Sequence, residues 1–280
     1  MKISVSMYSL ATTIKKEHWS VEQFIDYASM IAIDGVELLD VYWENKADIT
    51  EELDRVRVAL KKYNLRVSAY DIMNSFVKET REERAEEVTA VVNAIQVAKK
   101  LGTNIVRIFC GDAKEDLTFE KGFAWIIESL KECARTAEKE QVYLAIENHG
   151  LLAGKSRQVK EIIDAVNSPY VKSTFDTGNF LLVHEKPTKA FEQLKNDIVH
   201  VHFKDFRAKT ANESVRGFLS TDGLELIGVI PGDGEVDLNY IVEGLKNIHY
   251  DGWLSIEYEG HDDAKKANAE AVNRLRNLLN

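Results

Sequence analysis

The sequence is poor in cysteine and proline. Its two cysteines, Cys110 and Cys133, are too few for a disulfide framework and are not spaced as CxxC, so we expect free thiols in a reducing compartment. Only three prolines occur among 280 residues, of which 45% are hydrophobic and 29% are charged. This composition excludes a disordered or fibrous chain and indicates a globular protein with an ample core.

Long apolar segments and an excess of positive charge are also missing. No run approaches the ~20 apolar residues that a membrane span requires, and "KISVSMYSL" after Met1 lacks the apolar stretch of a signal peptide. We therefore expect a cytoplasmic protein that does not enter membranes. The 36 Lys and Arg against 46 Asp and Glu leave a net charge of −10, which disfavours a nucleic-acid partner.

Short runs rich in β-branched residues recur along the chain and alternate with segments of helical periodicity. The eight runs cover residues 3–9, 35–42, 65–72, 104–111, 142–150, 171–179, 197–205 and 253–260. Thr80 and Glu83 have the spacing of a helix-capping box, and a last helix is expected near 262–279. Alternating strands and helices build parallel sheets, and eight such units close a (β/α)8 TIM barrel.

The competing architecture is a doubly wound open sheet, which carries a glycine-rich turn after its first strand. Here that position reads "SMYSLATT" and has no glycine, so we predict a closed α/β barrel in a single domain, residues 1–280. One connection is unusually long, because about residues 206–237 follow the seventh strand where two to six residues are usual. We expect this segment to be either a lid or binding loop, or an added surface hairpin.

Ionisable side chains lie on one face of the last four predicted strands, late in each strand. Counting every second residue gives Glu147 and His149, then Asp176, then His200, His202 and Lys204, then Glu257 and Glu259. In a closed barrel these faces converge at the C-terminal mouth. Carboxylates gathered there without a cation would repel one another, and a divalent metal removes the repulsion. Carboxylates with one imidazole suit Mn²⁺, Mg²⁺, Co²⁺ or Zn²⁺.

Two basic residues of the predicted strands are expected to support the cluster. His200 lies two residues deeper than His202, so we expect it to orient a ligand or to pack. Arg107, on the fourth strand, is expected to pair with an acid such as Glu37 or Glu147 and only secondarily to contact a substrate.

Three further polar residues are candidates for binding a substrate. His149 is assigned to substrate hydroxyls, with a structural hydrogen bond as the alternative. Asn179, after Asp176, is expected to do the same or to cap the next helix. Lys204 is expected either to neutralise a substrate anion or to form a salt bridge with Glu257 or Glu259.

Five segments resemble those of the xylose isomerase-like TIM barrel superfamily, specifically its sugar phosphate isomerase/epimerase family. They are "IENHG" (146–150), "DTGN" (176–179), "HVHFKD" (200–205), "PGDGEVD" (231–237) and "GWLSIEYEG" (252–260). The resemblance covers essentially the whole chain. It implies that one divalent metal ion is held by Glu147, Asp176, His202 and Glu257.

The resemblance also implies an activity, a metal-dependent isomerase or epimerase of a keto sugar or sugar phosphate. In epimerases of this group the two ligand glutamates act as acid and base, which makes Glu147 and Glu257 the catalytic residues. The reaction removes a proton next to a carbonyl, and a metal stabilises the enediolate that forms.

Other functions on the same scaffold remain open. The main alternative is a lyase: a dehydratase of a cyclic keto-polyol or a dehydroshikimate-like acid, or a sugar deglycosidase acting by β-elimination. A phosphodiesterase that cleaves DNA with three zinc ions needs more histidine and acid ligands and a cationic groove. A non-catalytic binding subunit with a structural metal is the last hypothesis. No motif reports whether the chain forms a homo-oligomer.

Overall fold

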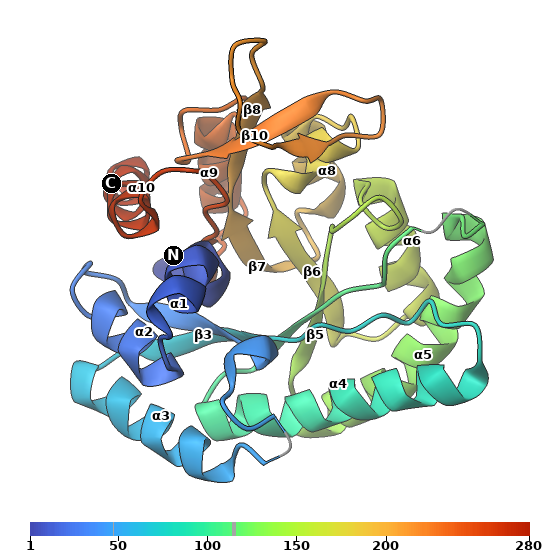
Figure 1. Cartoon of the computed structure of the whole chain (residues 1–280). Helices are drawn as coiled ribbons and strands as arrows, with labels where there is room; N and C mark the ends of the chain where they lie inside the picture. The colour runs from blue at the N-terminus through green and yellow to red at the C-terminus, as the bar shows by residue number, and fades with distance from the viewer. Residues whose placement is uncertain (47, 114–115) are drawn as a thin grey trace.

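A closed parallel barrel organises the chain (Figure 1). The computed structural model describes residues 1–46, 48–113 and 116–280. Within these residues, the strand order β1-β11-β7-β6-β5-β4-β3-β2 makes each barrel strand the neighbour of the barrel strand that precedes it in the sequence. The barrel strands are β1 (Lys2–Ser6), β2 (Gly35–Leu39), β3 (Arg66–Asp71), β4 (Ile105–Ile108), β5 (Tyr143–Glu147), β6 (Val171–Asp176), β7 (Ile198–Phe203) and β11 (Trp253–Ile256). The predicted (β/α)8 barrel is confirmed.

Helices cover the outside of the barrel. The α-helices are α1 (Ala11–Glu17), α2 (Val21–Ala28), α3 (Thr50–Tyr63), α4 (Arg81–Leu101), α5 (Phe119–Glu140), α6 (Ser156–Val166), α7 (Asn179–Leu182), α8 (Pro187–Leu194), α9 (Leu238–Asn247) and α10 (Ala264–Leu279), with short 3-10 turns η1 (Met7–Leu10) and η2 (Asp40–Tyr42). Buried apolar residues of the strands and helices form one large core, and Ala69, Ile105 and Ala145 form a small separate cluster. None of the described helices is both long and apolar enough to cross a bilayer.

Local signals in the sequence set the helix ends. The Thr80 side chain accepts a hydrogen bond from the Glu83 amide and Glu83 reaches back to the Thr80 amide, so the expected capping box begins α4. Gly102 ends the same helix with a φ of 79°, a left-handed conformation that suits glycine. The last helix begins at Ala264, close to the expected position.

The long connection after β7 folds as a three-stranded antiparallel sheet. Its strands β8 (Asp205–Ala208), β9 (Phe218–Leu219) and β10 (Glu225–Val229) pair in the order β8-β10-β9. In Figure 1 its orange strands β8 and β10 lie at the edge of the molecule, on the side away from α3 and α4. The segment for which a lid or a hairpin was expected is therefore a small sheet, which follows the C-terminal end of β7.

A close backbone approach joins this added sheet to the end of β11. Gly228 of β10 forms a parallel bridge with Gly260. A Cβ atom at position 228 would lie 2.5 Å from the carbonyl oxygen of Glu259, so only glycine fits there. The sheet is thus held beside the segment that carries Glu257 and Glu259.

Asp205, the first residue of β8, fastens the turn that follows β10. Its buried carboxylate accepts hydrogen bonds from the backbone amides of Gly232 and Gly234, both at 2.9 Å, and of Val236 at 3.0 Å. One side chain therefore fixes the turn that leads from β10 to α9.

We predict that Asp205→Ala lowers the free energy of unfolding by ~1–3 kcal/mol, because it leaves backbone donors without an acceptor. Asp205→Asn keeps one acceptor oxygen and should cost less. Asp54→Ala, which removes an exposed carboxylate of α3 that pairs with Arg57, serves as the control and should change stability little. Urea unfolding measures all three variants. Equal stability of the two alanine variants would contradict the assigned role.

Candidate metal centre and active site

Four side chains meet at the C-terminal mouth of the barrel. Glu147 ends β5, Asp176 ends β6, His202 lies on β7 and Glu257 directly follows β11. One potential ligand atom from each lies within 4.8 Å of the others, and all four residues are buried. The structure thus brings together the four residues that the sequence singled out, and their role as metal ligands stays a prediction. We call them the quartet.

The Nδ1 atom of His202 faces the three carboxylates of the quartet. It lies 3.3 Å from Glu257 Oε2, 3.6 Å from Glu147 Oε2 and 3.7 Å from Asp176 Oδ2. His202 Nδ1 is buried and has no hydrogen-bond partner among the described residues, and the buried Asp176 Oδ2 lies 3.2 Å from Lys204 Nζ. Buried polar atoms are normally satisfied, so this arrangement fits a ligand shared by the quartet. Carboxylate oxygens with one imidazole nitrogen are a donor set for a divalent cation.

The quartet is strongly charged. Burial opposes ionisation of Glu147, but the charges of His202 and Arg107 outweigh it and lower the pKa of Glu147 to about 2. Burial likewise opposes ionisation of Glu257, yet His202 and Lys204 hold its pKa below the ordinary value. Burial alone would lower the pKa of His202, but Glu257 and the other nearby carboxylates raise it well above its usual range. Both glutamates are therefore ionised at neutral pH.

Hydrogen bonds around β5 and β6 orient Asp176 and Glu147. Asp176 Oδ1 accepts from the amides of Gly178 at 2.8 Å and Asn179 at 2.7 Å, which leaves Oδ2 facing the quartet. Asn148 bonds the backbone of Asp176 in both directions, at 2.9 and 3.0 Å. Asn179 Nδ2 donates to Glu147 Oε1 at 3.1 Å. Asn179, a predicted substrate-binding residue, thus also positions a carboxylate of the quartet.

Arg107 forms a buried pair with two acids. Its Nε lies 3.2 Å from Glu147 Oε2, and its Nη2 donates to Asp71 Oδ2 at 3.2 Å. The expected pairing with Glu147 is present. Asp71 takes the place that Glu37 was expected to occupy, because Glu37 bonds the histidines of β7 instead.

Lys204 bridges the quartet to the rim. Its Nζ lies 2.6 Å from Glu257, 3.1 Å from Glu259 and 3.2 Å from Asp176. Burial would lower the pKa of Lys204, but these carboxylates, Asp176 first among them, raise it well above the ordinary value. The hydroxyl of Tyr8 donates to Glu259. The expected salt bridges to Glu257 and Glu259 are both present, and the ammonium is protonated.

A cavity of about 270 Å³ opens above the quartet. Its polar lining comprises Arg107, Glu147, His149, Asn179, Lys204, Glu257 and Glu259. Its apolar and aromatic lining comprises Tyr8, Leu39, Met73, Phe109, Leu182 and Phe218. All four residues predicted to bind substrate therefore border one space with the two glutamates, and Phe218 brings the added sheet to the same wall. A second cavity, about 370 Å³ beside Trp43 and Tyr70, includes none of the quartet.

His149 is the most accessible of the predicted substrate-binding residues. Its side chain is 40% exposed, and its ring stacks on Phe109 with centroids 4.1 Å apart. Its Nδ1 lies 3.9 Å from Asp112, a distance too long for a direct hydrogen bond. The ring is therefore held by packing on Phe109, and the residue lines the cavity.

Sequence reasoning missed four residues that complete this site. Glu37 was considered only as a partner of Arg107, and Asp71, Tyr8 and Phe218 were not considered. The same inspection of charged residues in strands would have found Glu37, in the middle of β2, and Asp71, the last residue of β3. Phe218 carried no such signal, because β9 has only two residues.

Comparison with known sequences gives relatives that match about half of the chain. An inosose dehydratase of Lacticaseibacillus casei is 32% identical over 150 residues, which cover 51% of this chain and 47% of the relative. An inosose dehydratase of Clostridium perfringens strain 13 is 27% identical over 147 residues, covering 50% and 48%. The chain spans about half the length of the curated relatives it matches.

Solved structures match nearly the whole fold at low sequence identity. An IOLI protein with a bound zinc atom has a TM-score of 0.80 at 16% identity, covering 100% of this chain and 98% of the other. A D-tagatose 3-epimerase-like protein has a TM-score of 0.77 at 20% identity with the same coverage. The probable 3-DHS dehydratase AsbF of Bacillus anthracis has a TM-score of 0.74 at 19% identity, covering 99% of each chain. At these sequence identities, the structural similarities show the fold alone.

The family follows from a match along most of the sequence. The family model described as "Xylose isomerase-like TIM barrel" matches residues 25–278, from within α2 almost to the end of α10. This chain therefore belongs to the xylose isomerase-like TIM barrel family.

Proposed function

We propose that the chain is a divalent-metal-dependent lyase, a dehydratase that removes water from a small cyclic keto-polyol. The observation that carries the proposal is one cavity bordered by two ionised glutamates, Glu147 and Glu257, and by the buried ammonium of Lys204. The names of the curated relatives support this alternative better than the isomerase or epimerase that the motifs first suggested. Those relatives match half of the chain, so the substrate is part of the proposal.

The quartet is the proposed binding site of one divalent ion, with Glu147, Asp176, His202 and Glu257 as its ligands. When bound, the ion supplies a Lewis acid that stabilises negative charge developing on a carbonyl oxygen of the substrate. Glu147 is the proposed base, which takes the proton from the carbon next to the carbonyl. Arg107 and Asn179 hold its two oxygens, so the carboxylate is fixed before the substrate arrives.

Lys204 is the proposed acid for the second half of the reaction. The electron pair of the broken C–H bond forms the enolate, which expels a hydroxyl group from the β-carbon. The Lys204 ammonium gives that hydroxyl a proton, so water leaves and a carbon–carbon double bond conjugated to the carbonyl remains. Glu257, 2.6 Å from Nζ, holds the ammonium in place. Arg107 cannot act as the general acid, because a guanidinium does not release its proton.

The lining of the cavity supports a small polyhydroxylated substrate. Its volume of about 270 Å³ lies at the lower end of the range of ligand sites, ~300–1,000 Å³. His149 and Asn179 present polar atoms for hydroxyl groups on one side. Met73, Phe109 and Phe218 form an apolar wall that suits the C–H face of a ring.

An epimerase is the second candidate, and one feature of the geometry favours it. Glu147 and Glu257 reach the cavity from β5 and from the end of β11, which are separated by β6 and β7. Two carboxylates that approach from different strands are what is needed to remove a proton from one face of a carbon and return it to the other.

The decisive test is incubation of the metal-loaded protein with a panel of cyclic keto-polyols and keto sugars in D₂O. A dehydratase produces an enone, seen as new ultraviolet absorbance, from one class of substrate. An epimerase produces deuterated epimer without enone. The Glu147→Gln variant, which lacks the proposed base, is the control and should give neither signal. Deuterium incorporation with no enone from any compound would contradict the dehydratase.

We predict that Lys204→Met separates the two halves of the reaction. Loss of the general acid should slow enone formation by ~10²–10⁴-fold, while exchange of the α-proton with solvent continues through Glu147. Lys204→Arg retains the positive charge but not a transferable proton, and it controls for the loss of a buried ion pair. Equal loss of exchange and elimination in both variants would show that Lys204 is not the acid.

Metal removal gives an independent prediction. Dialysis against a chelator should abolish turnover and lower the melting temperature, because the carboxylates of the quartet then lose their shared cation. At a free metal concentration one hundred times the Kd, re-addition of Mn²⁺, Co²⁺, Zn²⁺ or Mg²⁺ should restore ~2.7 kcal/mol of stability. Asp176→Asn should lose most of this metal-dependent gain. A chelated protein that keeps its activity and its melting temperature would rule out the metal.

A further inference from the structure

We infer that Glu37 and His200 are positioning residues that fix the ring of His202, so that His202 presents only Nδ1 to the carboxylates of the quartet. This inference rests on the proposed metal site. Neither residue contacts the cavity of about 270 Å³, and neither belongs to the quartet. They act through His202 alone.

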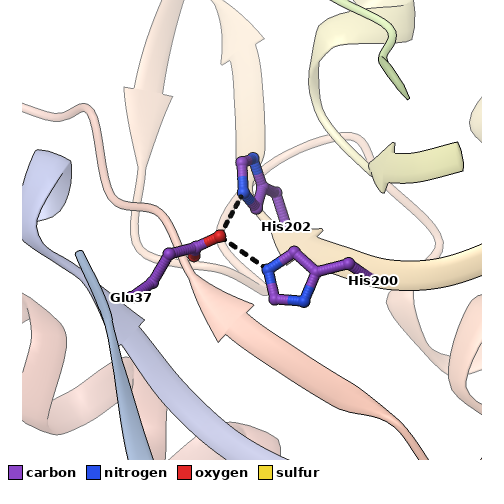
Figure 2. A group of neighbouring side chains, drawn as sticks. All are labelled: Glu37, His200 and His202. Carbon is purple, nitrogen blue, oxygen red and sulfur yellow. Dashed lines mark hydrogen bonds and ion pairs between the residues drawn. The ribbon is translucent and has the colours of Figure 1, made fainter. Parts of the chain in front are cut away.

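One carboxylate oxygen of Glu37 holds both imidazoles of β7 (Figure 2). Glu37 Oε1 lies 2.6 Å from His200 Nε2 and 3.0 Å from His202 Nε2. All three side chains are completely buried. The two rings meet edge to face, with centroids 5.4 Å apart and an interplanar angle of 84°. Glu37 comes from β2, across the barrel from β7, so the contact also ties two distant strands together.

The hydrogen-bonding capacity of a carboxylate determines where the protons lie. Ionised Glu37 can only accept, so each imidazole that bonds it must carry a proton on Nε2. A neutral His202 with its proton on Nε2 has its lone pair on Nδ1, the atom that faces Glu147, Asp176 and Glu257. The shared oxygen of Glu37 thereby selects the tautomer that can bind a cation.

His200 in turn fixes the position of the Glu37 carboxylate. The second oxygen of Glu37, Oε2, is buried and has no hydrogen-bond partner among the described residues. The carboxylate is therefore placed by its two imidazole contacts, of which the one to His200 is the shorter. Removing the donor on His200 frees Glu37 to turn and weakens its hold on His202.

A second metal ion offers a different explanation of the same cluster, because Glu37, His200 and His202 are also grouped closely enough to bind one. His202 would then have to lose both ring protons and bridge two ions. Two hydrogen bonds, of 2.6 and 3.0 Å, satisfy the same three atoms without that step. The geometry therefore favours positioning over a second site.

The test measures metal affinity rather than activity. Mn²⁺ and Zn²⁺ binding to the chelator-treated protein is followed by competition with a fluorescent chelator, with the metal content determined in parallel. We expect Glu37→Gln and His200→Leu to weaken binding 10–100-fold. His200→Gln places an amide donor where His Nε2 was and should restore most of the affinity. In the zinc form, ¹⁵N NMR of the histidine rings should show a protonated Nε2 on His202, and a mixture of tautomers in Glu37→Gln.

A matched control separates this effect from the general cost of altering a buried glutamate. Glu52, on α3 rather than on a barrel strand, is also buried, and its carboxylate accepts a hydrogen bond from the amide of Glu44. Glu52→Gln should leave metal affinity unchanged. If His200→Leu does not fold, Glu37→Gln carries the test with the same readouts.

The possible results distinguish the inference from the proposal on which it rests. Wild-type protein that binds no ion would overturn both the metal site and the positioning role. Wild-type binding with unchanged affinity in Glu37→Gln and His200→Leu, while Asp176→Asn is weakened, would overturn only the positioning role. Two ions per chain in the wild type, reduced to one in His200→Leu, would replace it with a second metal site.

Discussion

The site depends on how buried carboxylates are neutralised inside a barrel that water hardly reaches. Glu147, Asp176 and Glu257 would repel one another if they were left alone in a low-dielectric interior. Each glutamate has its own cation, Arg107 for Glu147 and Lys204 for Glu257. The two cations differ in that a guanidinium keeps its proton and an ammonium can transfer one. The two cations that neutralise the glutamates therefore also make the surroundings of Glu147 and Glu257 chemically different.

Most of the barrel could be predicted from sequence because its determinants are local. Strand and helix alternation, the capping box at Thr80 and the left-handed glycine at 102 each depend on a few neighbouring residues. The added sheet could not be predicted, because its pairing depends on contacts between distant backbone segments. The bridge of Gly228 to Gly260 and the bonds of Asp205 are of this kind. A two-residue strand such as β9 has no periodicity to detect.

The candidate site was predictable to the extent that strand parity places side chains on a common face. Parity and the motifs both selected the quartet, and the structure brings its members together. It was harder to predict which acid pairs with each cationic side chain, because several acids lie at similar distances from the same cation. Arg107 was expected beside Glu37 or Glu147 and lies between Glu147 and Asp71. The choice depends on the register of the neighbouring strands β3 and β4, which sets Asp71 opposite Arg107.

The added sheet has a consequence for how the shape of the cavity is set. Phe218 reaches the cavity from residues 205–229, whereas the quartet and Arg107 come from barrel strands or directly follow one. Part of the cavity wall, at Phe218, thus comes from a segment that lies outside the barrel strands. A substitution in that segment can reshape the cavity while the side chains of the quartet keep their positions.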